Sequence, residues 1–190
     1  FPYTTLFRSA DNGSISCVGI NDVDAAQGAV SRLVDGGRKR IALINHDLSY
    51  KYARLRERGY KAALHALSLE YQAVEYASEL SSSAGIAAMK TFLAAEVKPD
   101  AVFAVSDTLA AGAMRAIFDA GLQIPQDIAV VGFDGTELAE MVSPQLSTIE
   151  QPSRDIGRKA VGLLLNKIEN PDAQTERVMM DWRYISRAST

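Results

Sequence analysis

The sequence predicts an α/β fold built on a doubly wound parallel sheet, and three observations lead to this prediction. Apolar segments of strand length alternate with amphipathic segments of helix length at roughly 25–30 residue intervals, the spacing of β-α-β units. The strand segments are apolar runs rather than alternations, which is typical of strands covered by helices on both faces. Hydrophobic residues make up 47% of the 190 residues and charged residues 23%, so the chain has enough apolar content for a buried core.

The first part of the chain carries four expected strands, each followed by a helix. Apolar runs predict strands at residues 15–20, 41–44, 71–77 and 101–105, the third being the weakest. Apolar residues at helical spacing after a capping side chain predict helices from Asp22 or Asp24 to Val34, from about Tyr50 to Ala66, from Ser82 or Ser83 onward, and from Asp107 to Gly121. Gly36-Gly37 is expected to end the first of these helices.

The second part of the chain continues the same alternation with shorter strands. A near-continuous apolar strand is expected at residues 128–133, where Asp134-Gly135 breaks it, and a short extended segment is expected at residues 146–149. Pro152 is expected to open a helix through about Ile168. After the turn at residues 170–172, the final strand is expected at residues 178–185.

Charge and residue counts exclude several function classes. Twenty Lys and Arg against 23 Asp and Glu give a net charge of −3, so the chain itself is a poor candidate for direct nucleic-acid binding. One cysteine, Cys17, excludes an internal disulfide, and only two histidines accompany it, which argues against a zinc site. No apolar run approaches the ~18 residues of a membrane span. We expect a cytoplasmic protein with no metal, no cofactor and no membrane partner.

Polar side chains follow three of the expected strands. These are Asn45-His46-Asp47, Ser106-Asp107 and Asp134. Ligands bind at the carboxyl ends of the strands in open parallel sheets, so these residues are candidates for a binding site.

Each candidate also has a structural interpretation. Asp107 is interpreted as a helix N-cap, and Asp134 fits an Asp-Gly turn as well as it fits ligand binding. Arg56 lies on a helix with Arg54 and Arg58, which is typical of solvated charge. His46 is expected to be structural or exposed rather than catalytic. No nucleophile elbow, phosphate-binding loop, dinucleotide fingerprint or metal-binding helix is present, so no catalytic residue is predicted.

Several motifs occur in a fixed order along the chain. They are GGRKRIA at 36–42, RERGY at 56–60, SDTLAAGAM at 106–114, IPQDIAVVGFD at 124–134, LSTIEQP at 146–152 and RAST at 187–190. Each is weak alone, but as an ordered set they resemble the lactose-repressor/galactose-repressor (LacI/GalR) family of bacterial transcription regulators.

The resemblance implies a periplasmic-binding-protein-like fold with one nearly complete lobe and a remnant of the other. Residues 22–150 and 176–190 would form the C-terminal lobe, and residues 10–21 and 151–175 would belong to the N-terminal lobe. The remainder of that lobe and the helix-turn-helix DNA-binding domain would be missing from residues 10–190. Residues 1–9 resemble the translation of a sequencing-library adapter, so we exclude them from the fold.

The resemblance also implies roles for individual residues. Arg56 and Asp134 would clamp the effector, and Ser106 would contact it. Leu80 stands where the family often has an aromatic wall, and Tyr50 and Tyr52 would line the mouth of the site. A homodimer surface is implied at Ala111, Met114, Met141 and Val142.

The function implied is that of the effector-sensing and dimerisation part of a transcription regulator, most often a repressor. The effector would be a small sugar-like or nucleoside-like molecule held between two lobes, and operator DNA would be bound through the missing helix-turn-helix. Two alternatives remain: a periplasmic sugar-binding protein of a transport system, which shares the Gly132-Phe133-Asp134 element, and a small-molecule-processing enzyme.

Overall fold

The computed structural model of the chain describes residues 15–190. Their contacts divide them into two compact units: residues 15–21 with Gln151–Trp182, and Asp22–Glu150 with Arg183–Thr190. The adapter-like segment, residues 1–9, lies outside the described residues.

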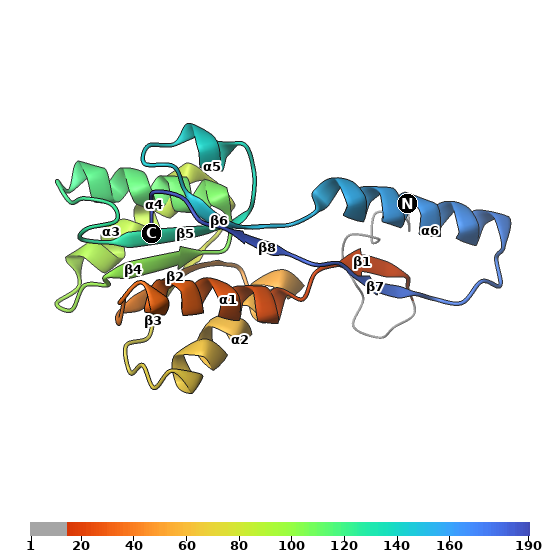
Figure 1. The fold of residues 1–190 in the computed structure, drawn as a ribbon, viewed down its shortest axis with the longest axis horizontal. Helices are drawn as coiled ribbons and strands as arrows, with labels where there is room; N and C mark the ends of the chain where they lie inside the picture. Colours follow the sequence, from red (N-terminus) through yellow and green to blue (C-terminus); the bar gives the residue numbers. More distant parts are fainter. Residues whose placement is uncertain (1–14) are drawn as a thin grey trace. The chain divides into compact units, whose positions relative to one another are not determined.

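The larger unit is built on a six-stranded sheet in the order β3-β2-β4-β5-β6-β8 (Figure 1). Adjacent strands from β3 to β6 are parallel, and β8 is antiparallel to β6. The strands are β2 (Ile41–His46), β3 (Ala73–Ala77), β4 (Ala101–Ala104), β5 (Ala129–Asp134), β6 (Ser147–Glu150) and β8 (Arg183–Ile185).

Two pairs of helices cover the opposite faces of this sheet (Figure 1). On one face α1 (Asp22–Asp35) packs against α2 (Lys51–Ala66), and on the other α3 (Ser82–Ala94) packs against α4 (Asp107–Asp119). A short helix that the sequence analysis missed, α5 (Leu138–Met141), packs against α4. The arrangement confirms the predicted doubly wound α/β fold.

The apolar strand runs are the physical basis of this architecture. Every residue of β2 and β4 is buried, as double coverage by helices requires. The rings of Phe103 and Phe133 lie 6.3 Å apart between adjacent strands, and burying each large apolar side chain contributes about 1.5–3 kcal/mol. The buried Tyr60 hydroxyl donates to the Ile41 carbonyl at 2.7 Å, so this polar group is satisfied inside the core.

The smaller unit contains the strands β1 (Cys17–Gly19) and β7 (Arg177–Met179), which pair in parallel, and the helix α6 (Ser153–Glu169). α6 contacts β1 and buries Ala160 and Leu163. Its Val161, Leu165 and Ile168 side chains are exposed. The described part of this unit therefore covers only one side of an amphipathic helix.

The end of the chain differs from the sequence prediction. The single strand expected at residues 178–185 is wrong, because β7 pairs with β1 in the smaller unit while β8 pairs with β6 in the larger one. The family resemblance implied that the C-terminal lobe resumes at residue 176. In the structure residues 176–182 belong to the smaller unit. Residues 180–182 between the two strands carry no regular structure.

Two helical glycines allow α3 and α4 to approach closely. A β-carbon at Gly85 would overlap the carbonyl oxygen of Leu109, and one at Gly112 would overlap that of Ser82. Both overlapping atoms belong to the backbone. A side chain at either glycine could therefore be accommodated only if one helix shifted as a whole.

We expect Gly85→Ala to lower the free energy of unfolding by about 1–3 kcal/mol, because the added methyl group overpacks the contact between the two helices. Urea unfolding followed by circular dichroism measures the change. Gly157→Ala is the control, because the space around a β-carbon there is open. Equal stability of Gly85→Ala and the unsubstituted protein would contradict the close-contact interpretation.

Candidate functional site

The carboxyl edge of the six-stranded sheet brings together residues from β2, β4 and β5. Because these strands are parallel, their ends and the following loops lie at the same edge. His46 is the last residue of β2 and Asp134 the last residue of β5, while Ser106 follows β4. The sequence predicted an edge of this kind, although it placed Asn45 and His46 after β2 rather than within it.

Arg56 is the most extensively held side chain at this edge. It extends from α2 with a side chain only 7% exposed, and its Nε donates to Asp22 Oδ1 at 2.8 Å. Its Nη1 donates to the Val105 carbonyl at 2.7 Å and lies 3.7 Å from Asp134 Oδ1. The guanidinium is thus a fixed, nearly buried charge. The presence of Arg54 and Arg58 on the same helix had instead suggested a solvated side chain.

Aromatic rings enclose the guanidinium of Arg56. Its central carbon lies 3.5 Å from the centroid of the Phe133 ring and 4.9 Å from that of Tyr52. Cation–π contacts of this kind strengthen when water is excluded, so the rings help to hold the buried charge.

Asp134 combines an exposed carboxylate with an unusual backbone. Its side chain is 34% exposed, the largest exposure in the Arg56–Asp22–Asp134 group. Its φ is 111°, in the region that favours glycine, and Gly135 follows with φ 71°. Asp134 thus ends β5 with a glycine-like backbone conformation, and its carboxylate lies beside Arg56.

The structure gives Ser106 the helix-capping role that the sequence analysis gave to Asp107. Ser106 is the N-cap of α4, and its buried hydroxyl accepts a hydrogen bond from Leu109 N at 3.2 Å. The N-cap interpretation of Asp107 is wrong: its Oδ2 accepts from Thr136 N at 2.7 Å and Thr136 Oγ1 at 2.9 Å, and its Oδ1 accepts from Thr148 Oγ1 at 2.6 Å. The N-cap of α4 therefore lies at Ser106, one residue before the predicted Asp107.

Tyr50 and Tyr52 form an aromatic group with His46. The His46 and Tyr50 rings are stacked with centroids 4.5 Å apart, and the Tyr52 hydroxyl lies 2.5 Å from His46 Nδ1. The sequence predicted that His46 is structural or exposed and did not group it with the two tyrosines. Its position at the end of β2, four and six residues before the two tyrosines, was the signal that could have placed it in this group.

Leu80 comes from another part of the same edge, after β3. It is 43% exposed in the loop between β3 and α3, at the edge strand of the sheet, whereas the grouped residues come from α2 and the ends of β2 and β5. The structure brings Arg56, Asp134 and Tyr52 together directly, and it connects Ser106 to them through the neighbouring Val105 carbonyl.

The residues proposed for a dimer surface have unequal exposure. Met141 at the end of α5 is 80% exposed, Ala111 and Val142 are half-buried, and Met114 is buried in α4. Phe118, seven residues after Ala111 on α4, is 72% exposed.

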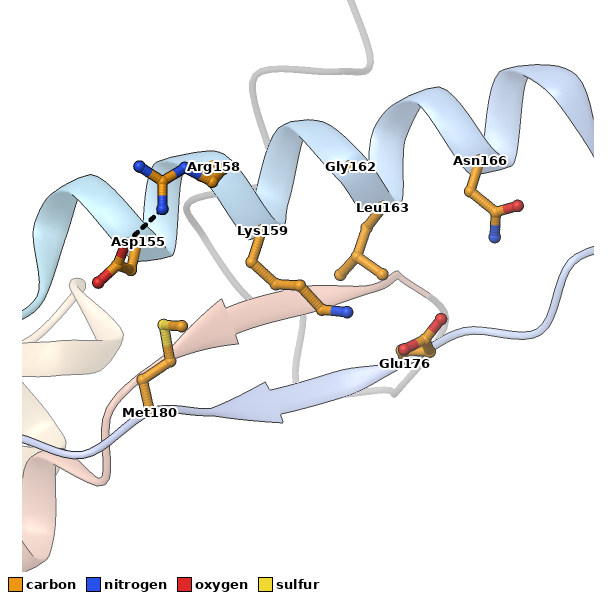
Figure 2. A pocket seen from close by; sticks show the side chains of 8 residues that line it. All are labelled: Asp155, Arg158, Lys159, Gly162, Leu163, Asn166, Glu176 and Met180. Atoms are coloured by element: carbon orange, nitrogen blue, oxygen red, sulfur yellow. Dashed lines mark hydrogen bonds and ion pairs between the residues drawn. The ribbon is translucent and has the colours of Figure 1, made fainter.

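A groove of about 560 Å³ lies in the smaller unit, between α6 and the β1–β7 pair (Figure 2). Lys159 and Leu163 point from α6 toward the strands, and Asp155 pairs with Arg158 at 2.9 Å. Apart from the buried Leu163, the side chains that line the groove are exposed or half-buried. The fixed and buried polar groups lie instead at the edge of the larger sheet, where we place the candidate site. The lining residues are Asp155, Arg158, Lys159, Gly162, Leu163, Asn166, Glu176 and Met180.

Within residues 15–190, no group of three His, Cys, Asp or Glu residues is placed to hold a metal ion. In the same part of the chain, no helix is both long enough and apolar enough to cross a bilayer.

Comparisons with known proteins define the family of this chain. The sequence profile of the periplasmic binding protein-like domain matches residues 30–190. The ribose operon repressor of Escherichia coli (strain K12) is 37% identical over 162 residues, which cover 85% of this chain and 49% of the repressor. An uncharacterised protein from Actinobacillus succinogenes matches with a TM-score of 0.92 and 46% identity, over 96% of this chain and 67% of that protein. A LacI family transcriptional regulator from Enterococcus faecium with bound ribose matches with a TM-score of 0.87 and 27% identity, over 96% of this chain and 67% of the regulator.

The chain therefore belongs to the periplasmic binding protein-like domain family, and within it to the LacI/GalR group that the motif resemblance predicted. It spans about half the length of the ribose operon repressor.

Burial raises the pKa of the Asp107 carboxyl above its usual value, although the hydrogen bonds from Thr148 and Thr136 oppose this shift. Because the folded state then holds the proton more tightly than the unfolded chain, the contribution of Asp107 to stability falls as pH rises from the usual pKa to the raised one.

We expect carbon-13 NMR of the Asp107 carboxyl to show a titration midpoint above that of the exposed Asp47, whose pKa the hydrogen bonds from Ser49 lower. A midpoint for Asp107 below that of Asp47 would contradict the effect of burial.

Proposed function

We propose that this chain is the effector-sensing and dimerisation part of a bacterial transcription regulator, and that it binds a small hydroxylated molecule at the carboxyl edge of the six-stranded sheet. The observation that carries this proposal is the pairing of Arg56, which is fixed and nearly buried, with Asp134, whose carboxylate is partly exposed 3.7 Å away. A carboxylate that accepts hydroxyl hydrogens beside a guanidinium that donates a fork is an arrangement suited to a polar small molecule.

Charge favours a neutral ligand within the sugar and nucleoside classes. Asp22 pairs closely with Arg56, so the positive charge already has a partner before Asp134 is counted. The three residues together carry one net negative charge, which attracts hydroxyl donors and repels anions. The flat faces of Tyr52 and His46 lie nearby and suit the apolar face of a ring. The ribose in the Enterococcus faecium structure supports a sugar.

The remaining features of the proposal concern the full-length protein. Operator DNA would be bound through a helix-turn-helix outside residues 10–190, because a net charge of −3 gives this chain no overall positive field to attract DNA. The regulator would act in the cytoplasm as a homodimer and would have no catalytic role. The match to the ribose operon repressor favours this function over that of a periplasmic transport protein.

We expect Arg56→Ala and Asp134→Ala, made in the full-length regulator, each to weaken sugar binding roughly thirtyfold or more. Removing one partner of a buried, charged hydrogen bond costs about 2–5 kcal/mol, and each 1.4 kcal/mol is about tenfold in affinity. Calorimetry with a panel of neutral pentoses and hexoses identifies the ligand and measures the change. Operator binding without ligand should be retained in both variants, and the response of operator binding to the sugar should be lost.

Arg58→Ala is the matched control, because Arg58 is exposed on the same helix. Arg54 is a poorer control, since it donates to the Leu48 and Ser49 carbonyls beside Tyr50. Asp134→Ala that binds sugar as tightly as the unsubstituted regulator would restrict Asp134 to a turn and refute the proposed site.

Dimerisation is proposed to use the α4–α5 surface, defined as Ala111, Met114, Phe118, Met141 and Val142. α5 packs against α4, and both elements expose large apolar side chains there. Exposed apolar side chains that form one surface mark an interaction site.

We expect the double variant Phe118→Glu and Met141→Glu to shift the protein from dimer toward monomer, because two charges would be buried without partners at the interface. Sedimentation velocity measures the mass. Val97→Glu, which charges an exposed apolar residue between α3 and β4, is the control and should remain dimeric. A double variant that dimerises as strongly as the control would exclude this surface.

A further inference from the structure

Asp107 is buried beside the proposed ligand-binding residues, although its hydrogen bonds are directed toward a loop. We propose that Asp107 is a positioning residue, which fixes residues 135–136 and thereby holds Asp134 in the backbone conformation that places its carboxylate beside Arg56. The inference rests on the proposed function of Asp134 and extends it to a residue that does not face the ligand.

Both carboxylate oxygens of Asp107 are engaged with the chain segments around Asp134. Oδ2 accepts the backbone N–H of Thr136 at 2.7 Å and its hydroxyl at 2.9 Å. Oδ1 accepts the hydroxyl of Thr148 at 2.6 Å, and the oxygen of that hydroxyl accepts the backbone N–H of Gly135 at 3.3 Å. The two amides that follow Asp134 are therefore both tied to Asp107, one directly and one through Thr148 in β6.

The backbone at Asp134 needs such a restraint. Its φ of 111° lies in a region that residues with a side chain rarely adopt, and Gly135 continues with φ 71°. A strained conformation of this kind persists only where the surrounding structure fixes it. Strand pairing with Glu150 fixes Asp134 itself. The hydrogen bonds of Asp107, which we call the Asp107 clamp, fix residues 135–136 that follow it.

Gly132 shows that the strand makes room for the Asp107 carboxylate. A β-carbon at Gly132 would overlap Asp107 Oδ1, so only glycine lets this oxygen lie against β5. The strand held in this way carries both Phe133, under the Arg56 guanidinium, and Asp134, beside it. Movement of Asp107 would therefore be transmitted to both partners of Arg56 on β5.

The choice of a carboxylate at this position supports positioning rather than general stabilisation. Asp107 is 1% exposed, and the partners described for it are hydroxyl and amide groups rather than cations. Burying a carboxylate among neutral donors is costly, and an apolar residue would avoid that cost. A carboxylate supplies two acceptor oxygens on opposite sides, which the loop and β6 require simultaneously.

Asp107→Asn tests the inference, because an amide keeps the shape but replaces one acceptor oxygen with a donor. With its oxygen toward Thr148, the amide leaves the Thr136 N–H without its acceptor; with its oxygen toward Thr136, it replaces the acceptor of the Thr148 hydroxyl with a donor. We expect faster hydrogen exchange at the Thr136 amide, by about tenfold or more, and an Asp134 backbone coupling constant that no longer indicates a positive φ. NMR of the 190-residue chain measures both without any ligand, and the amides of β4 should keep their protection.

Thr148→Val provides a second route if Asp107→Asn does not fold. It keeps the shape of the buried side chain and removes the hydroxyl that joins Asp107 to Gly135, so it should change the same two signals. Asp100→Asn is the matched control, because Asp100 clamps the backbone N–H groups of Lys39 and Arg40 at the opposite edge of the sheet. Asp134 φ and Thr136 exchange that stay unchanged in both Asp107→Asn and Thr148→Val would overturn the inference.

Ribose titration of the full-length regulator separates this inference from the proposed function. Asp107→Asn should weaken ribose binding about tenfold, the effect of losing one hydrogen bond to a charged group. Asp134→Ala should weaken ribose binding roughly thirtyfold or more, while the Thr136 amide stays protected. An unsubstituted regulator that binds no ribose would count against a ribose ligand, and the NMR signals would still decide the role of Asp107.

Discussion

Keeping Arg56 charged in a nearly buried position is the constraint on which the candidate site depends. A guanidinium does not lose its proton in a protein, so burial has to be balanced by partners. Asp22 at the start of α1, the Val105 carbonyl after β4 and Asp134 at the end of β5 supply them. These partners come from three parts of the larger unit that are distant in sequence, and they meet only because the sheet is parallel and doubly covered. The parallel, doubly covered sheet thus supplies the partners that a buried guanidinium requires.

Close backbone approach is the second requirement of the larger unit. Gly85 and Gly112 let α3 and α4 pack in close backbone contact. The start of α4 carries Ser106 as its N-cap and Asp107 one residue later. Gly132 then admits the clamp carboxylate to β5. Glycines therefore permit two close contacts in this unit, one between α3 and α4 and one between Asp107 and β5.

The described parts of the two units differ in how fully their apolar side chains are buried. The larger unit buries all of β2 and β4 between helices, whereas α6 of the smaller unit buries Ala160 and Leu163 and exposes Val161, Leu165 and Ile168. An amphipathic helix with apolar residues on more than one side is suited to burial on more than one side. Its pattern agrees with a chain that spans about half the length of the ribose operon repressor.

Local patterns in the sequence determined the order of strands and helices, and the motif resemblance singled out Arg56 and Asp134. Apolar runs and helix caps depend on neighbouring residues, so the α/β alternation could be predicted without the structure. The roles of Ser106 and Asp107 could not, because the partner that distinguishes them, Thr148, lies 41 residues away from Asp107. The same reason applies to the split of residues 178–185 into β7 and β8, which pair with strands more than 30 residues distant in the chain. Only the tertiary structure decides contacts of this kind, since hydrogen bonds between distant segments leave no periodic pattern in the residues that make them.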